Sequence, residues 1–182
     1  MKQEIIARFT LELLLQIDEK LSTDPELEIN ILTMGVFDLN EALACYDYSR
    51  TIENLDRISV SFCGEDVSFE ALVATAGFNP ENRMALPHCQ YKHDKLNSYV
   101  YGDRNRILSQ KEAAAQIKTA FTSILTSVYD LPVDYLDNES KPIPAIESPF
   151  FVDYNTGANQ VPVPMPEPED DSIVKTEEGD EF

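Results

Sequence analysis

Residues 58–62 read Ile58-Ser59-Val60-Ser61-Phe62, so three large apolar residues alternate with two serines. A period of two predicts a β-strand with one buried face. Residues 27–31, Leu27-Glu28-Ile29-Asn30-Ile31, repeat the alternation and predict a second strand. Gly35 and Gly64 follow the two stretches and mark the expected end of each strand. The chain is therefore expected to contain a sheet.

Two long segments instead have the period of an α-helix. Apolar residues recur at steps of three and four over residues 3–21 and again over residues 110–130. Ser109 followed by Glu112 has the form of a capping box at the start of the second segment. We expect both segments to be helices that pack on the sheet through one apolar face. Shorter helices are expected over residues 38–46 and 69–76.

The segment between the helical patterns is less regular. Residues 78–96 show neither period, and we expect a long connection there. Beyond it, Tyr99 and Tyr101 lie on either side of a valine, and Gly102-Asp103 precedes residues 104–107, which predicts a hairpin. The whole pattern predicts an α+β fold in which a small sheet of about four strands is packed by two long helices.

The chain changes character beyond residue 137, where seven of its eleven prolines lie and no apolar period remains. We divide it into a compact α+β domain over residues 1–137, an extended Pro-rich arm over 138–166 and an acidic tail over 167–182. The tail holds eight acidic residues and one lysine, ends in Phe182, and is expected to be disordered until bound.

The arm contains aromatic residues that a solvated linker would lack. Phe150, Phe151 and Tyr154 are close together in the sequence. We expect them to dock on another surface because exposed apolar clusters usually mark interaction sites. That surface is either the chain's own domain or a neighbouring subunit.

Charge and cysteine content exclude some classes of protein. The chain has 33 acidic and 14 basic residues, a net charge of −19, which disfavours a protein that wraps duplex DNA. No apolar stretch is long enough to cross a bilayer, and the N-terminal residues lack the basic start of a signal peptide. The three cysteines are widely spaced, as in reduced thiols rather than a disulfide framework. We expect a cytoplasmic protein without a membrane partner.

Few residues point to catalysis or to a cofactor. The six glycines are never closer than thirteen residues, which excludes the usual phosphate-binding loops and the nucleophile elbow of hydrolases. His88, Cys89 and His93 are the one cluster of metal-ligand types, and they lack the paired short spacings of a zinc site. We therefore predict no enzyme, no metal and no cofactor, although whether this cluster binds a metal stays open.

One segment is basic in an otherwise acidic chain. The stretch from Arg83 to Lys111 contains six basic and only two acidic residues, and tyrosines lie between them in the sequence. Cations that follow phosphates and rings that stack on bases are typical of single-strand binding, and the same cations could receive the acidic tail. The candidate residues are Arg83, Tyr91, Lys92, Lys95, Tyr99, Tyr101, Arg104 and Arg106.

The last six residues, Glu177-Glu178-Gly179-Asp180-Glu181-Phe182, resemble the C-termini of single-stranded-DNA-binding proteins of bacteria and of T7-like phages. The resemblance implies a tail whose terminal phenylalanine docks in a basic-rimmed pocket of a partner, or which covers the protein's own DNA site. The rest of the chain departs from that family, because its N-terminal region lacks the five-strand pattern of an OB-fold.

These observations favour a non-catalytic assembly or adaptor protein, of the kind that phages encode as structural or accessory components. Its arm residues Phe150, Phe151 and Tyr154, and the tail residue Phe182, would bind protein partners or other copies of the chain, so an oligomer is plausible. Two alternatives stay open. One is an accessory protein that binds single-stranded nucleic acid and has an autoinhibitory or partner-recruiting tail, and the other is an acidic mimic of DNA.

Overall fold

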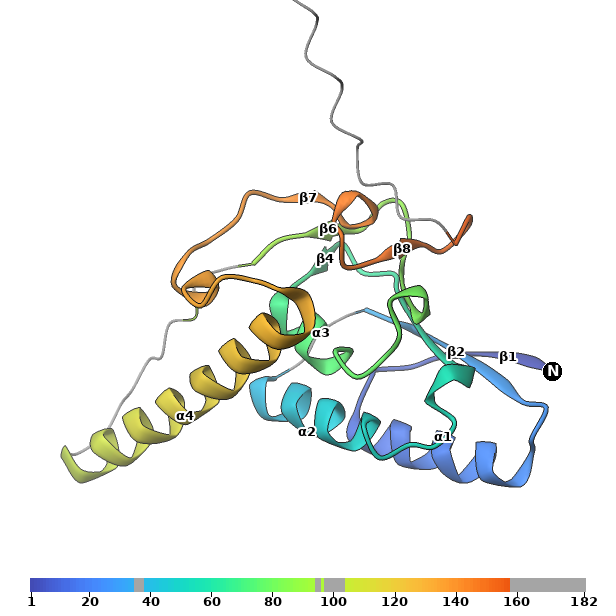
Figure 1. Cartoon of the computed structure of the whole chain (residues 1–182), viewed down its shortest axis with the longest axis horizontal. Coiled ribbons are helices and arrows are strands. Elements are labelled where there is room, and N and C mark those ends of the chain that lie inside the picture. Colours follow the sequence, from blue (N-terminus) through green and yellow to red (C-terminus); the bar gives the residue numbers. More distant parts are fainter. Residues whose placement is uncertain (35–37, 94–95, 97–103, 158–182) are drawn as a thin grey trace, which may run out of the picture.

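The computed structural model describes residues 1–34, 38–93, 96 and 104–157 (Figure 1). At its centre is a five-stranded sheet in the order β1-β2-β3-β5-β8, in which every neighbouring pair is parallel. The two edges are β1 and β8, so the strands join the sheet in the order in which they occur in the chain. The strands are β1 (Lys2–Ile6), β2 (Glu28–Thr33), β3 (Ile58–Phe62), β5 (Arg83–Ala85) and β8 (Val152–Asp153).

Three helices connect the first strands and lie in one layer. They are α1 (Leu11–Thr23), α2 (Leu39–Ser49) and α3 (Phe69–Ala74), and α2 packs between α1 and α3. Crossovers between parallel strands are almost always right-handed. Because the strand order advances in one direction, that rule places all three helices on the same face, and Figure 1 shows α1 and α2 together below the strands.

A second sheet and a long helix complete the described chain. The sheet has the order β4-β6-β7 and consists of β4 (Asp66–Val67), β6 (Gln90–Tyr91) and β7 (Ile143–Pro144). The helix α4 (Arg104–Tyr129) separates β6 from β7 in the sequence. Four short 3-10 helices lie in the connections, η1 (Leu55–Arg57), η2 (Pro80–Asn82), η3 (Tyr135–Asp137) and η4 (Ala145–Glu147).

The core forms where the apolar side of the sheet meets the helix layer. Ile31, Val60 and Phe62 are fully buried on the sheet side, and Leu14 and Ile17 of α1 are buried opposite them. Each such side chain contributes about 1.5–3 kcal/mol on burial. The predicted strand over 58–62 is confirmed as β3, and the predicted strand over 27–31 corresponds to β2.

Polar caps fix where two of these helices begin. The Thr10 hydroxyl accepts a hydrogen bond from the Leu13 N–H at 3.2 Å, and the Asp38 carboxylate accepts one from the Glu41 N–H at 2.8 Å. Each cap satisfies a backbone donor that the first turn leaves free. The expected short helices near residues 38 and 69 are confirmed as α2 and α3.

The predicted helix over residues 3–21 is wrong in its first third. Lys2–Ile6 form β1, in register with β2, and α1 begins only at Leu11 after its cap Thr10. The apolar steps at Ile6 and Phe9 matched a helical stripe by coincidence, because Ile6 is exposed and Phe9 is buried after the strand ends. Pairing with β2 gives the first residues a ladder of backbone hydrogen bonds that a local pattern does not reveal.

The structure also corrects the region from 78 to 130. The expected long connection contains β5 and β6, and α4 starts at Arg104, before the predicted start at residue 110. Residues 104–107 are therefore helical and not the second strand of a hairpin, while residues 97–103 lie outside the described residues. The fold mixes strands and helices as predicted, but it is a mainly parallel α/β sheet with more strands than the expected four.

The opposite face of the central sheet is polar. The hydroxyls of Ser59 and Ser61 donate to the Asn30 side-chain oxygen at 3.0 and 2.8 Å, and the Asn30 amide donates to Glu4 at 3.4 Å. The Tyr154 hydroxyl, just beyond β8, also donates to Glu4 on β1. Because β1 and β8 are the two edge strands, this side-chain bond links the two ends of the polar face, on which Asn30 and Ser61 are fully buried.

Candidate interaction surface

The aromatic residues expected to anchor the arm on another surface are packed inside this chain. Phe151 is fully buried, with its ring centre 5.3 Å from that of Phe62 on β3. Phe150 is 9% exposed, and its ring lies edge-on to Tyr91 and Tyr129 at 5.3 and 5.5 Å. The arm thus docks in cis through Phe150 and Phe151, one of the two arrangements that the sequence left open.

Two other candidate arm residues differ in position. Tyr154 is half-buried and bonds to Glu4, as described above, so its hydroxyl is also engaged within the chain. Phe182 lies outside the described residues. Only the tail therefore remains as a candidate partner-binding element of the original set.

The candidate basic and aromatic patch is not a continuous surface. Arg83 is 5% exposed and Tyr91 is 3% exposed, so both belong to the interior. Lys92 is half-buried. Arg104 and Arg106 lie in the first turns of α4, and Lys95, Tyr99 and Tyr101 lie outside the described residues.

The interior of this region is rich in tyrosine hydroxyls. The hydroxyl groups of Tyr91 and Tyr135 are 2.5 Å apart, and burial raises the pKa of both phenols. The Tyr129 hydroxyl donates to the Leu72 carbonyl at 2.7 Å, and burial also raises its pKa. These phenols are therefore protonated at neutral pH and serve as structural hydrogen-bond donors.

The cluster of metal-ligand types is dispersed. The His88 ring is exposed with its Nε2 atom 3.1 Å from the Cys63 carbonyl, while the buried Cys89 thiol donates to the Phe62 carbonyl at 3.1 Å. The His93 ring is buried and stacks on Tyr135, with 4.0 Å between ring centres. Within the described part of the chain, no group of three or more His, Cys, Asp or Glu residues could hold a metal ion.

The long helix α4 extends beyond the rest of the described fold at its first end. Figure 1 shows its yellow-green end extending away from the other helices and strands. Phe121, Ile124 and Leu125 in the second half are buried, whereas no residue from Lys111 to Ala120 is. The helix contacts α2, α3 and η3, and its buried residues among those described lie in the second half.

A hollow of about 650 Å³ runs along this helix, and we call it the α4 groove. Val133, 72% exposed, lies at its edge, just after the helix ends. Most of its lining side chains are small or carry hydroxyl groups, so the helix backbone is accessible to a close neighbour. The helix residues that line it are Ala115, Lys118, Thr119, Thr122, Ser123, Thr126 and Ser127.

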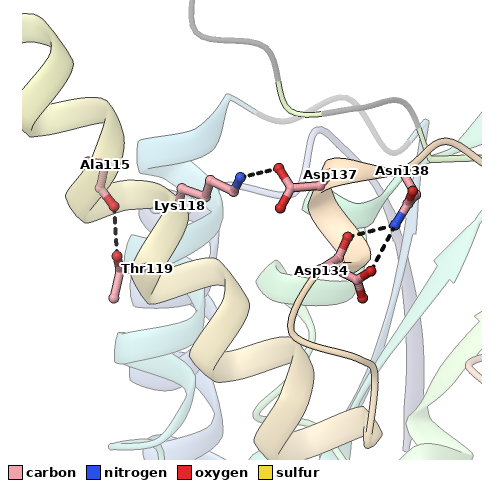
Figure 2. A network of polar contacts seen from close by, with 6 residues as sticks. All are labelled: Ala115, Lys118, Thr119, Asp134, Asp137 and Asn138. Carbon is pink, nitrogen blue, oxygen red and sulfur yellow. Dashed lines mark hydrogen bonds and ion pairs between the residues drawn. The ribbon is translucent and has the colours of Figure 1, made fainter.

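Figure 2 shows the polar contacts of three residues that line the groove, Ala115, Lys118 and Thr119, and of the turn that follows α4. Lys118 on α4 forms an ion pair with Asp137 on η3, which ties the returning chain to the helix. The Asn138 amide donates to the Asp134 carbonyl at 2.9 Å and orders the same turn. The Thr119 hydroxyl donates to the Ala115 carbonyl at 2.8 Å, so it does not project toward a ligand.

The groove suits protein contact better than chemistry. Its lining contains one charged side chain, Lys118, and no histidine, cysteine or carboxylate. Small residues on a helix allow a second helix to approach closely, with the ridges of one in the grooves of the other. An amphipathic partner helix is the ligand type that such a surface accepts.

Comparisons with known proteins do not assign the chain to a family. No protein-family model matches it, and no curated protein matches it significantly. No helix of the described ranges is long and apolar enough to cross a bilayer.

Sequence reasoning missed the α4 groove although a signal was present. Ala115, Thr119, Thr122, Ser123 and Thr126 follow one another at helical steps of three, four and one, and they share one face of the predicted helix. The same helix also carries the apolar stripe from which it was predicted. A second stripe of small residues on a long helix indicates a face on which another helix can pack.

Proposed function

We propose that the chain is a non-catalytic assembly or adaptor protein that binds a partner protein through the α4 groove. The observation that carries this proposal is the open hollow of mostly small and hydroxyl-bearing side chains along α4 from Ala115 to Ser127. The Lys118–Asp137 ion pair links one lining residue of the groove to the chain that follows the helix. A preordered surface loses less conformational entropy on binding than a flexible one.

The length of α4 supports the same proposal. The helix has 26 residues and is about 39 Å long at 1.5 Å per residue. Isolated helices are marginal in water, and most helical stability in proteins comes from tertiary packing. The buried residues of its second half supply that packing at one end only. A partner helix in the groove would add packing on a second face of this half of α4.

The acidic tail is the second partner-binding element of the proposal. Its eight acidic residues would steer the chain toward a basic surface, and Phe182 would supply one aromatic anchor. The tail begins ten residues after Gly157, the last described residue, so it can be removed without cutting any described strand. Binding of single-stranded nucleic acid is a weaker candidate because Arg83 and Tyr91 are buried.

The test compares a groove variant with a matched variant outside the groove. Ser123→Arg places a long charged side chain in the groove, and Gln116→Arg places the same side chain on an exposed position of α4 that does not line it. Tagged wild-type chain and both variants are used to isolate partners from the natural source, followed by titration calorimetry with the purified candidate. We expect a partner that binds the wild type and Gln116→Arg but binds Ser123→Arg at least about tenfold more weakly.

Two results would refute the proposal. One is that every protein isolated binds Ser123→Arg as strongly as wild type. The other is that residues 1–157 bind a labelled single strand with a steep salt dependence, which would favour the nucleic-acid alternative.

A further inference from the structure

The strand β1 is an unpartnered edge of the central sheet. Its inner side pairs with β2, where the Glu28 N–H donates to the Met1 carbonyl at 2.9 Å and the Ala7 N–H donates to the Leu32 carbonyl at 3.1 Å. Backbone groups of a strand alternate in direction along the chain. The two bonds show that the backbone groups of Met1 and Ala7 point toward β2, and by alternation those of Gln3 and Ile5 do too. The N–H and C=O groups of Lys2, Glu4 and Ile6 therefore point away from the sheet. No described residue pairs with this outer side.

The side chains of β1 also alternate between two environments. Glu4 lies on the polar face, where it accepts hydrogen bonds from Asn30 and Tyr154, so Lys2 shares that face. Ile5 packs against the core on the helix side, so Met1 and Gln3 share the helix side. Each face of the edge thus presents its own pattern to a neighbouring strand.

We propose that β1 pairs with β1 of a second copy of this chain, antiparallel and about a two-fold axis through Gln3. In this register Lys2 lies opposite the second copy's Glu4, and Met1 lies opposite its Ile5. The Lys2 and Glu4 backbones, which point outward, then exchange N–H···O=C bonds in both symmetry-related pairs. The two sheets become one continuous sheet of ten strands.

Charge decides between this register and its neighbours. A shift of the pairing that keeps the outward backbone groups facing each other places either Lys2 opposite Lys2 or Glu4 opposite Glu4. Like charges directly opposite each other across a strand pair are destabilising, and opposite charges are stabilising. The register centred on Gln3 is the one of the three that joins Lys2 to Glu4 twice.

The apolar residues agree with this arrangement. Met1 is 79% exposed, and it lies opposite the half-buried Ile5 in the proposed pair. Both side chains lie on the helix side of the sheet, so the pair withdraws the exposed Met1 from water.

The interface is small, and both copies carry a net charge of −19, so we expect a reversible dimer. The test measures the mass of the full chain by sedimentation equilibrium up to about 1 mM at about 0.15 M salt, where exposed charges are screened beyond about 8 Å. We compare the wild type with Lys2→Glu, with Glu4→Lys, and with an equimolar mixture of these two variants.

The mixture separates pairing from other effects of charge. Each variant alone faces like charges in both pairs, and we expect its dissociation constant to rise about tenfold. In the mixed dimer both pairs are again opposite in sign, and association should return to within about threefold of wild type. Tyr154→Phe removes one of the two hydrogen bonds that Glu4 accepts within its own chain and should associate as the wild type does.

The proposal is overturned if the chain is monomeric at every concentration, or if the mixture associates no better than the separate variants. An unaltered dissociation constant in both single variants also overturns it. The result does not depend on the proposed function, since no partner protein is present and the α4 groove is unchanged. Ser123→Arg should dimerise normally, so failure at β1 and failure at the groove are distinguishable.

Discussion

The guanidinium carbon of Arg83 on β5 lies 4.7 Å from the centre of the Tyr129 ring on α4. This cation–π contact joins the central sheet to the end of the long helix. Arg83 is 95% buried, and its Nε and Nη1 atoms have no hydrogen-bond partner among the described residues. A desolvated charge without full pairing is costly, and an attractive ring offsets only part of that cost.

Replacement of Arg83 by methionine should therefore stabilise the chain. Arg83→Met keeps an unbranched side chain of similar length against the Tyr129 ring and removes the buried charge. We expect the free energy of unfolding to rise by about 1–2 kcal/mol in urea denaturation. Lys118→Met, at a position 36% exposed, is the control and should change it by less than about 0.5 kcal/mol. A clear loss of stability in Arg83→Met would show that the charge is satisfied in the folded state.

The arm should be part of the stable fold. Phe151→Ala removes a fully buried ring that packs on Phe62, and we expect it to cost about 3–5 kcal/mol. A chain ending at Gly157 should melt within a few degrees of the full chain, whereas one ending at Asp137 lacks β7 and β8 and should not fold. Circular dichroism melts measure all three. Equal melting of the two truncated chains would contradict the packing of the arm in cis.

Thiol reactivity should distinguish the three cysteines. Burial, with a smaller effect of Glu41, raises the pKa of Cys45 to about 12, and burial raises the pKa of Cys89. Both side chains are fully buried, while Cys63 is partly exposed. At pH 8 we expect Ellman's reagent to modify about one thiol per folded chain, because reactivity requires an accessible thiolate. All three thiols should react in guanidinium chloride, and folded Cys63→Ser should give almost no signal.

The carboxyl group of Glu4 should titrate at low pH. Hydrogen bonds from Tyr154 and, less strongly, from Asn30 lower its pKa below 4.5. A carboxyl with a lowered pKa in the folded state adds stability above its ordinary pKa and loses it as the pH falls through the folded value. An NMR titration should show the Glu4 pKa rising toward 4.5 in Tyr154→Phe. An identical titration curve in Tyr154→Phe would show that the bond across the polar face does not form in solution.

The elements that local patterns determine could be predicted from the sequence. The alternation over 58–62 predicts β3, because a strand depends on the period of its side chains. Asp38 with Glu41 predicts the start of α2, because a helix cap depends on residues within a single turn. The first strand could not be found in this way. Lys2–Ile6 have no clear alternation, and they extend because β2 lies beside them.

The site residues were harder to predict because burial is a property of the assembled fold. For Phe150 and Phe151 the sequence left open whether they dock on this domain or on a neighbouring subunit, and in the fold their rings fill space between the two sheets and α4. Arg83 was placed in a surface patch on its charge alone, and only pairing of β5 with β3 places it in the interior. Charge and aromatic content identify candidate residues, but the register of distant strands decides which of them reach solvent.

The strand order has a consequence for folding kinetics. β1, β2 and β3 are neighbours in both the chain and the sheet, so each can add to the previous one after closing a loop that contains a single helix. The strand β8 follows α4 in the sequence, so it can add to the sheet only by closing a loop that contains the whole of that helix. The Tyr154–Glu4 bond joins residues 150 positions apart. Contacts of such long sequence separation form late, because the chain must lose the entropy of the long loop before the contact contributes any stability. We therefore expect β8 to be the last strand to join the sheet during refolding and the first to detach in native-state hydrogen exchange.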